Sequence, residues 1–179
     1  MFSAQVEEGL ALRLLELRHA EALFNLIDQN REHLSYWFHD VAETKTVENC
    51  KTDIQEALEK FSKGEAFQLG IWLDGALVGA LGARDISSLF RSAEIGYWLA
   101  ESYQGRGVMT RVCAHICTYL FEERALNRIE IRCSETNERS RAIPERLGFT
   151  LEGKLRQMGY TKDGLVDYLI YGLLAEDWR

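Results

Sequence analysis

The chain has 179 residues, of which 46% are hydrophobic, 27% charged and 11% aromatic, and it has a single proline. This composition excludes a disordered chain and leaves room for one core with one cofactor-sized cleft. The net charge of −7 argues against nucleic-acid binding as the main task, and no stretch approaches the ~20 apolar residues that cross a bilayer.

The first third of the chain predicts one strand and two helices. The strand covers residues 10–15, and apolar residues at helical spacing predict helices over residues 18–30 and 47–63. Between the helices, residues 34–39 read Leu-Ser-Tyr-Trp-Phe-His, which is too aromatic for an ordinary loop. We expect this segment to be partly buried.

From residue 67 onward the pattern alternates between strands and helices. Asp74-Gly75 and Asp163-Gly164 have the composition of two-residue hairpin turns. The predicted strands cover residues 67–73, 77–84, 93–99, 128–133, 149–160 and 165–174, and the predicted helices cover residues 108–122 and 137–147.

This order predicts a mixed α/β (α+β) fold. Hairpins make most of the sheet antiparallel, whereas the strand at 93–99, the helix at 108–122 and the strand at 128–133 form a parallel strand–helix–strand unit. We find no repeat and no linker of low complexity. Residues 1–179 are therefore expected to form a single domain.

The turn Gln104-Gly105-Arg106-Gly107 lies inside this unit, between a strand and a helix. The first N–H groups of a helix lack partners within it and carry the positive end of its dipole, so they attract phosphate. Glycines allow close approach, and each can adopt positive φ. The position of Thr110 excludes a Rossmann fingerprint, which needs Gly there, and no Lys follows Gly107 as a P-loop requires. An ordinary tight turn remains the alternative.

Four segments together resemble the GNAT N-acetyltransferase superfamily, and more narrowly its RimJ/RimL branch of ribosomal-protein N-terminal acetyltransferases. They are Glu94–Leu99, Gln104–Met109, Asn137–Ser140 and Leu147–Phe149. The resemblance runs from about Leu10 to Leu174 and departs from many members at Met109, where they have Gly or Ala. It implies a central, mostly antiparallel sheet of about seven strands with helices on both faces.

The resemblance also implies that the chain uses acetyl-CoA as cosubstrate and no metal. In the family, the turn amides grip the CoA pyrophosphate, the preceding strand receives the pantetheine arm, and an Asn at the next helix hydrogen-bonds that arm. The corresponding residues are Trp98, Leu99, Gln104, Gly105, Arg106, Gly107, Val108, Met109, Thr110 and Asn137. Core packing for Trp98 and helix capping for Asn137 are the structural alternatives.

Two residues are candidates for proton transfer. The resemblance assigns Ser140 the return of a proton to the CoA thiolate, with helix capping as its alternative role. Glu94 is our candidate to accept the proton of the amine through water, with an ion pair to Arg91 or Arg132 as its alternative. Some relatives place a Glu in the late strand where this chain has Gly159, and Tyr160 and Asp167 are polar alternatives nearby.

The cysteines are not candidates for a covalent carrier. Cys50, Cys113, Cys117 and Cys133 lack CxxC spacing and an evident histidine partner, and no secretory leader is recognisable. Cys113 and Cys117 share a helix face, but no second pair supports a metal site. We therefore expect reduced, buried thiols in a cytoplasmic protein.

The predicted function is transfer of acetyl from acetyl-CoA to a primary amine, most simply a protein N-terminus, by direct attack in a ternary complex. A small amine such as a polyamine, aminoglycoside or amino acid is the alternative acceptor, and an acyl-CoA sensor without turnover is the alternative class. Tyr36, Trp37, Phe38 and His39 are suggested as the acceptor wall, with a core segment as the alternative. If residues 36–38 are exposed, a homodimer becomes plausible.

Overall fold

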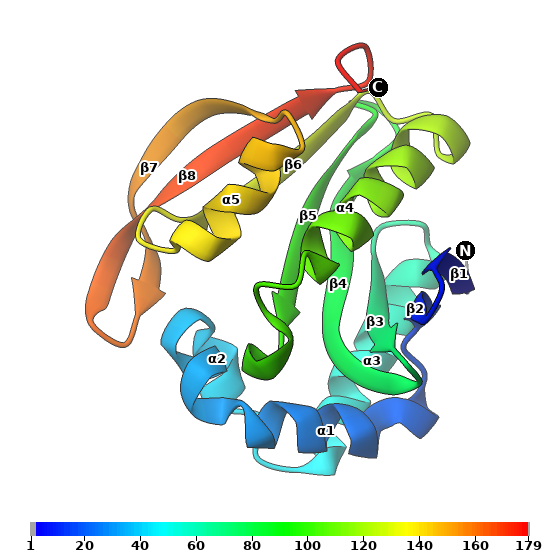
Figure 1. Cartoon of the computed structure of the whole chain (residues 1–179), viewed down its shortest axis with the longest axis vertical. Coiled ribbons are helices and arrows are strands. Elements are labelled where there is room, and N and C mark those ends of the chain that lie inside the picture. Colours follow the sequence, from blue (N-terminus) through cyan, green and yellow to red (C-terminus); the bar gives the residue numbers. More distant parts are fainter. Residues whose placement is uncertain (1–2, 179) are drawn as a thin grey trace.

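Eight strands form one open sheet in the order β1-β2-β3-β4-β5-β6-β8-β7 in the computed structural model, which describes residues 3–178 (Figure 1). The strands are β1 (Ser3–Glu7), β2 (Leu10–Leu14), β3 (Phe67–Leu73), β4 (Ala76–Ser87), β5 (Ser92–Leu99), β6 (Arg128–Ser134), β7 (Thr150–Thr161) and β8 (Gly164–Leu174). The helices are α1 (Ala20–Gln29), α2 (Arg31–Trp37), α3 (Val47–Ser62), α4 (Val108–Thr118) and α5 (Glu138–Arg146).

The predicted fold class is confirmed, including the parallel unit. β5 and β6 are the parallel pair, and every other neighbouring pair in the described sheet is antiparallel. The expected number of about seven strands is one too low, because β1 precedes the first predicted strand. β1 is a five-residue edge strand of alternating exposure, so it carries little of the apolar pattern that reveals buried strands.

Local sequence signals explain several element boundaries. Thr46 caps α3 through its Oγ1, which accepts a hydrogen bond from the Asn49 N–H at 3.2 Å. Asp74 and Gly75 both have positive φ, 49° and 82°, as the predicted two-residue turn between β3 and β4 requires. The helix predicted over residues 108–122 is α-helical to Thr118 and ends in a π-helical turn over Tyr119–Glu123.

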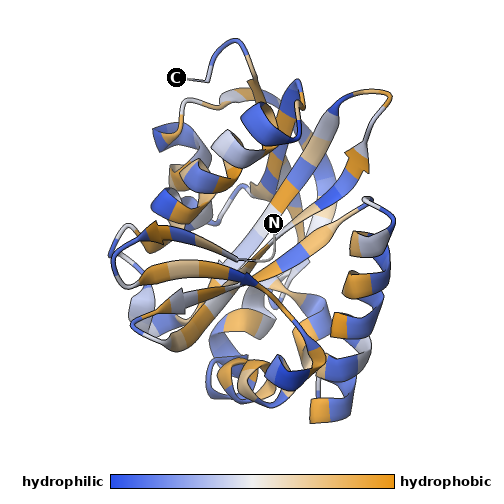
Figure 2. Cartoon of the chain, turned by 90° about the vertical axis from the view of Figure 1, so that its right-hand side faces the viewer, coloured by the Kyte–Doolittle hydropathy of each residue, from blue (hydrophilic) through white to orange (hydrophobic). Residues whose placement is uncertain are grey.

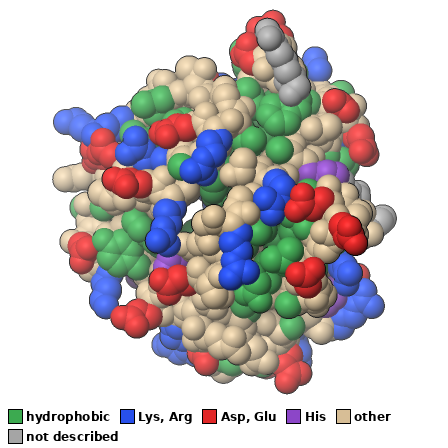
Figure 3. Space-filling view, in the orientation of Figure 1, with side chains coloured by type: hydrophobic (Ala, Val, Ile, Leu, Met, Phe, Trp, Pro, Cys, Tyr) green, Lys and Arg blue, Asp and Glu red, His purple; other side chains and the backbone are tan. Residues whose placement is uncertain are grey.

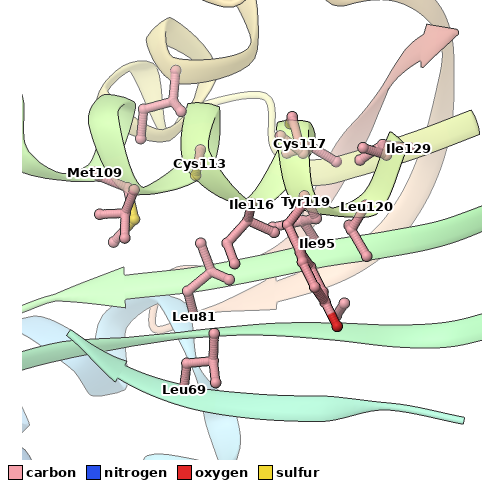
Figure 4. Packing of buried hydrophobic residues seen from close by; sticks show 14 of the residues in the cluster. Leu69, Leu81, Ile95, Met109, Cys113, Ile116, Cys117, Tyr119, Leu120 and Ile129 are labelled. Atoms are coloured by element: carbon pink, nitrogen blue, oxygen red, sulfur yellow. The ribbon is translucent and has the colours of Figure 1, made fainter. Parts of the chain in front are cut away.

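The main core lies between α4 and the middle of the sheet. Met109, Cys113, Ile116 and Leu120 repeat at helical spacing and face Ile95 and its neighbouring strands (Figure 4). In Figure 2, hydrophobic and hydrophilic residues alternate along the helices, as expected for elements with one face on the core. This packing fixes the start of α4 relative to the end of β5.

A second apolar cluster joins α1, α2 and α3 on the other side of the sheet. Leu23, Leu34 and Ile54 are buried in it, and Trp98 of β5 packs against it. Neighbouring residues of a strand point to opposite faces, so Trp98 and Leu99 connect β5 to the two clusters separately. The end of β5 is thereby held from both sides of the sheet.

Gly79 of β4 allows the closest approach of backbone to the end of β5. A Cβ atom at this position would lie 2.4 Å from the Trp98 carbonyl oxygen and 3.0 Å from the Leu99 Cα. Both neighbours are backbone atoms, which cannot rotate away as a side chain would. Gly79 therefore sets the position of Trp98 and Leu99.

We expect Gly79→Ala to lower the free energy of unfolding by about 1–3 kcal/mol, because the added methyl group forces β5 away from β4. Gly96→Ala is the matched control, because a Cβ atom at Gly96 on β5 would have no atom within 4 Å. That control is expected to stay within about 0.5 kcal/mol of the wild type. Chemical denaturation measures both, and equal midpoints for the two variants would contradict this assignment.

Candidate active site

The two parallel strands separate in the middle of the sheet. Their pairing runs from Ser92 opposite Arg128 to Ile95 opposite Ile131 and then stops. Beyond it, β5 stays paired with β4 and β6 stays paired with β8 (Figure 1). One edge of β5 from Gly96 to Leu99 is consequently left without a strand partner, so its backbone groups are available to a ligand.

The glycine turn begins where β5 ends. A short 3-10 turn over Glu101–Tyr103 leads to Gly105 and Gly107, which have φ values of +73° and +72°. Gly107 is the N-cap of α4 and offers no side chain to the first amides of that helix. The first amides of a helix have no partner within it, so this helix start has the groups that an anion site needs.

A cavity of about 1380 Å³ extends from this turn between α2, α5 and the separated strands. It is larger than the ~300–1,000 Å³ typical of a small-molecule site. Basic side chains gather beside the hollow at the centre of the face shown in Figure 3, and Arg111, Arg139 and Arg146 are among the lining residues. Glu32, Glu101 and Glu138 line the cavity as well, so its lining is mixed in charge, and its size can accept a long ligand together with a second molecule.

Most of the predicted cofactor residues line this cavity. They are Trp98, Leu99, Gln104, Gly105, Gly107, Val108, Met109, Thr110 and Asn137. Arg106 is the exception, and its guanidinium lies 5.4 Å from the centre of the Tyr103 ring in a cation–π contact.

Ser140 also lines the cavity, at the start of α5. The N-cap of α5 is Asn137, whose Oδ1 accepts a hydrogen bond from the Ser140 N–H at 3.0 Å. The Tyr97 hydroxyl donates to the Ser140 carbonyl oxygen at 3.1 Å, and burial raises the pKa of Tyr97 well above its usual value. Capping therefore explains Asn137, whereas the Ser140 hydroxyl is not used for it.

Glu94 lies outside the cavity lining. It is ion-paired with Arg84 and, at 3.4 Å, with Arg132, and only 8% of its side chain is exposed. These contacts match the structural alternative, a sheet carboxylate paired with arginine. One partner is the predicted Arg132, but the other is Arg84 in place of Arg91.

The aromatic segment forms α2 and part of the cavity wall. Tyr36, Trp37 and Phe38 are half-buried and line the cavity, and Phe38 also packs against the second core cluster. They do not form the exposed patch considered for a dimer. His39 is exposed and lies outside the lining, with its ring 6.0 Å from that of Tyr160.

The β7–β8 hairpin closes over α2. The Tyr36 hydroxyl donates to Asp163 Oδ2 at 2.6 Å, and this hydrogen bond raises the pKa of Tyr36. The Lys162 N–H donates to the Tyr36 carbonyl oxygen at 3.3 Å. The hairpin tip and α2 are thus joined by two hydrogen bonds, and of these residues Tyr36 is the one that lines the cavity.

Gly159 cannot be replaced by a glutamate without rearrangement, because a Cβ atom there would lie 1.9 Å from Cε1 of Tyr168. Tyr160 and Asp167, the polar residues considered as alternatives to a glutamate at this position, do not line the cavity. Asp167 accepts a hydrogen bond from the Gln157 N–H at 2.9 Å and pairs with Lys154 at 3.1 Å, and Tyr160 is exposed.

The four cysteines are free and buried. Burial raises the pKa of Cys117 to about 12 and that of Cys133 to about 11, although a hydrogen bond with Ser140 lowers the latter. A thiol in this state is a poor nucleophile at neutral pH. Within residues 3–178 no cluster of three or more His, Cys, Asp or Glu could hold a metal, and no helix could span a membrane.

Sequence reasoning missed several residues that line the cavity, among them His33, Tyr97, Arg111 and Arg146. His33 lines the cavity from α2, and its Nε2 lies 2.8 Å from Nε2 of Gln104. The spacing of His33 in the sequence could have indicated its place in the site. His33 precedes Tyr36 and Trp37 by three and four residues and therefore shares their helix face.

Comparisons with known proteins agree with this geometry. The sequence profile of the family described as "Acetyltransferase (GNAT) domain" matches residues 10–150. The "Putative ribosomal N-acetyltransferase YdaF" of Bacillus subtilis is 36% identical, over 100% of this chain and 98% of the relative. The ribosomal-protein-serine acetyltransferase of Escherichia coli is 28% identical over 96% of each chain. The solved structure of RimL, a ribosomal L7/L12 α-N-protein acetyltransferase in complex with coenzyme A, superposes with a TM-score of 0.93 at 27% identity, covering 96% of this chain and 97% of the other.

Proposed function

The chain belongs to the GNAT acetyltransferase family, and from this premise we propose that it acetylates the N-terminal amine of a protein, with acetyl-CoA as donor. Relatives named for ribosomal-protein acetylation make a ribosomal protein the first candidate acceptor. The observation that carries the proposal is the cavity that extends from the glycine turn to the aromatic residues Tyr36, Trp37 and Phe38.

The cofactor end of the proposal rests on the glycine turn. The pyrophosphate would accept hydrogen bonds from the amides that follow Gly105 and Gly107, at the positive end of the α4 dipole. Arg111, Arg139 and Arg146 line the same cavity and supply positive charge for the remaining phosphate. The similar structure of RimL in complex with coenzyme A supports coenzyme A as the ligand.

The acetyl end lies at the unpaired edge of β5. Attack by an amine builds negative charge on the thioester oxygen, and a fixed backbone N–H at Trp98 or Leu99 would stabilise it by a few kcal/mol. Gly79 and the two core clusters hold this edge in place. The Asn137 side chain, which lines the cavity at the start of α5, would orient the pantetheine arm.

Ser140 is the residue that we propose as general acid. Ser140 lines the cavity, its side chain is hydrogen-bonded with Cys133, and its backbone is fixed by Asn137 and Tyr97. As the C–S bond breaks, the hydroxyl would donate a proton to the departing thiolate of CoA. The geometry offers no comparable support for Glu94, so its role as general base stays a prediction.

Chemistry favours a terminal amine as acceptor. At pH 7, neutralising an α-amine of pKa ~8 costs about 1.4 kcal/mol, against about 4.6 kcal/mol for lysine. An N-terminal acceptor therefore needs only weak base assistance.

Gly107→Leu is expected to weaken acetyl-CoA binding at least about a hundredfold, because a side chain in the turn displaces the pyrophosphate from two or more charge-assisted hydrogen bonds. Gly64→Leu is the matched control, with a φ of +74° and open space, after α3 and away from the cavity. Isothermal titration calorimetry measures both. Equal affinities in the two variants would remove the turn from the binding site.

Ser140→Ala should lower kcat about 10²-fold or more, with an acetyl-CoA Kd within about twofold of the wild type, because the variant loses a general acid and keeps the Asn137 cap. A thiol-release assay measures kcat, and an unchanged kcat in Ser140→Ala would refute the assignment of Ser140.

Glu94→Gln separates the two roles considered for Glu94. A lower kcat in a stable protein indicates a general base, whereas lower stability with wild-type kcat indicates an ion-pair role. A thiol-release assay and chemical denaturation provide the two readouts.

The acceptor class is tested with two peptides of one sequence. One has a free N-terminus and no lysine, and the other has a blocked N-terminus and one internal lysine. We expect acetylation of the first only, because its α-amine is neutralised at much lower cost than the lysine amine. Mass spectrometry reads the product, spermidine serves as a small-amine arm, and turnover of spermidine or of the lysine peptide alone would overturn the proposal.

A further inference from the structure

One side chain of the glycine turn is bonded to three separate parts of the cavity. The Gln104 Oε1 accepts a hydrogen bond from Arg139 Nη1 of α5 at 2.7 Å. Its Nε2 donates to the Leu99 carbonyl oxygen of β5 at 3.1 Å and lies 2.8 Å from His33 Nε2 of α2. Because the amide nitrogen is a donor, His33 accepts through Nε2.

A second link joins the same two regions. The Glu101 N–H, three residues before Gln104, donates to Asn30 Oδ1 at 3.0 Å. Asn30 lies at the junction of α1 and α2, and its amide nitrogen donates to the Leu26 carbonyl oxygen at 2.9 Å. The segment that leads into the glycine turn is thus attached to α2 at two points. Glu101 is bonded to Asn30, which precedes the helix, and Gln104 is bonded to His33 in the first turn of the helix.

Helix α2 needs such attachments. It has seven residues, of which only Leu34 is buried, and a helix this short is unstable without tertiary contacts. Its C-terminal end is held by the hydrogen bond from Tyr36 to Asp163. His33 is the contact that joins the same helix to the turn, one helical turn before the aromatic wall of Tyr36 and Trp37.

We propose that His33 is a positioning residue that couples the cofactor turn to the acceptor wall. This inference rests on the proposed function, because it assumes that CoA occupies the glycine turn. When CoA orders the turn, Gln104 and His33 also order α2, so that the acceptor wall is completed only after the donor is bound. Coupling of this kind is reciprocal, and a bound acceptor would strengthen CoA binding by the same factor.

The test uses coenzyme A as the probe and needs no known acceptor. Hydrogen exchange of residues 31–37 is measured in the free protein and at saturating CoA, and calorimetry gives the Kd. The variants are His33→Ala and Gln104→Leu, which remove the bond from either end, and His33→Gln, whose amide oxygen can replace Nε2 as acceptor. Ser35→Ala on the same helix is the matched control, and chemical denaturation confirms that each variant is folded.

We expect CoA to slow exchange over residues 31–37 in the wild type, in His33→Gln and in Ser35→Ala. In His33→Ala and Gln104→Leu this slowing should be lost at saturating CoA, with a Kd raised about three- to tenfold, as for one hydrogen bond. Undiminished slowing in both of these variants, or none in a wild type that binds CoA, would overturn the coupling. A wild type that does not bind CoA would overturn the proposed function as well.

Discussion

The separation of β5 from β6 is the feature on which the rest of the site depends. A parallel pair that stops at Ile95 and Ile131 leaves one edge of β5 free while both strands stay paired on their other sides. The free edge, the glycine turn that follows it and the start of α5 then surround a single cavity. Packing of Trp98 and Leu99 into two different apolar clusters fixes the end of β5 beside this gap.

The elements around this gap are joined by polar contacts that are distant in sequence. Tyr36 of α2 is bonded to Asp163 of the β7–β8 hairpin, and Gln104 reaches both His33 and Arg139. Such contacts order short elements, such as α2, that cannot be stable alone. They tie the glycine turn and the aromatic residues of α2 to one cavity.

Local signals made much of the fold predictable. The capped helix Val47–Ser62, the Asp74-Gly75 turn and the glycine turn are specified by neighbouring residues, and each lies where the sequence placed it. The resemblance supplied the cofactor residues, most of which line the cavity. Two kinds of feature were missed: β1, whose polar alternation is weak, and contacts between distant residues, such as Arg84 with Glu94 or His33 with Gln104. Partners of this kind are set by the topology of the sheet, which periodicity does not report.

The central claim is that coenzyme A occupies the gap between the separated strands. Amide chemical-shift mapping during a titration with coenzyme A tests it most directly, because it reports on every backbone N–H at once. The account predicts the largest shifts at residues 97–110 and 137–140, which border the cavity from its two sides. Shifts concentrated elsewhere, or confined to one side of the gap, would contradict it.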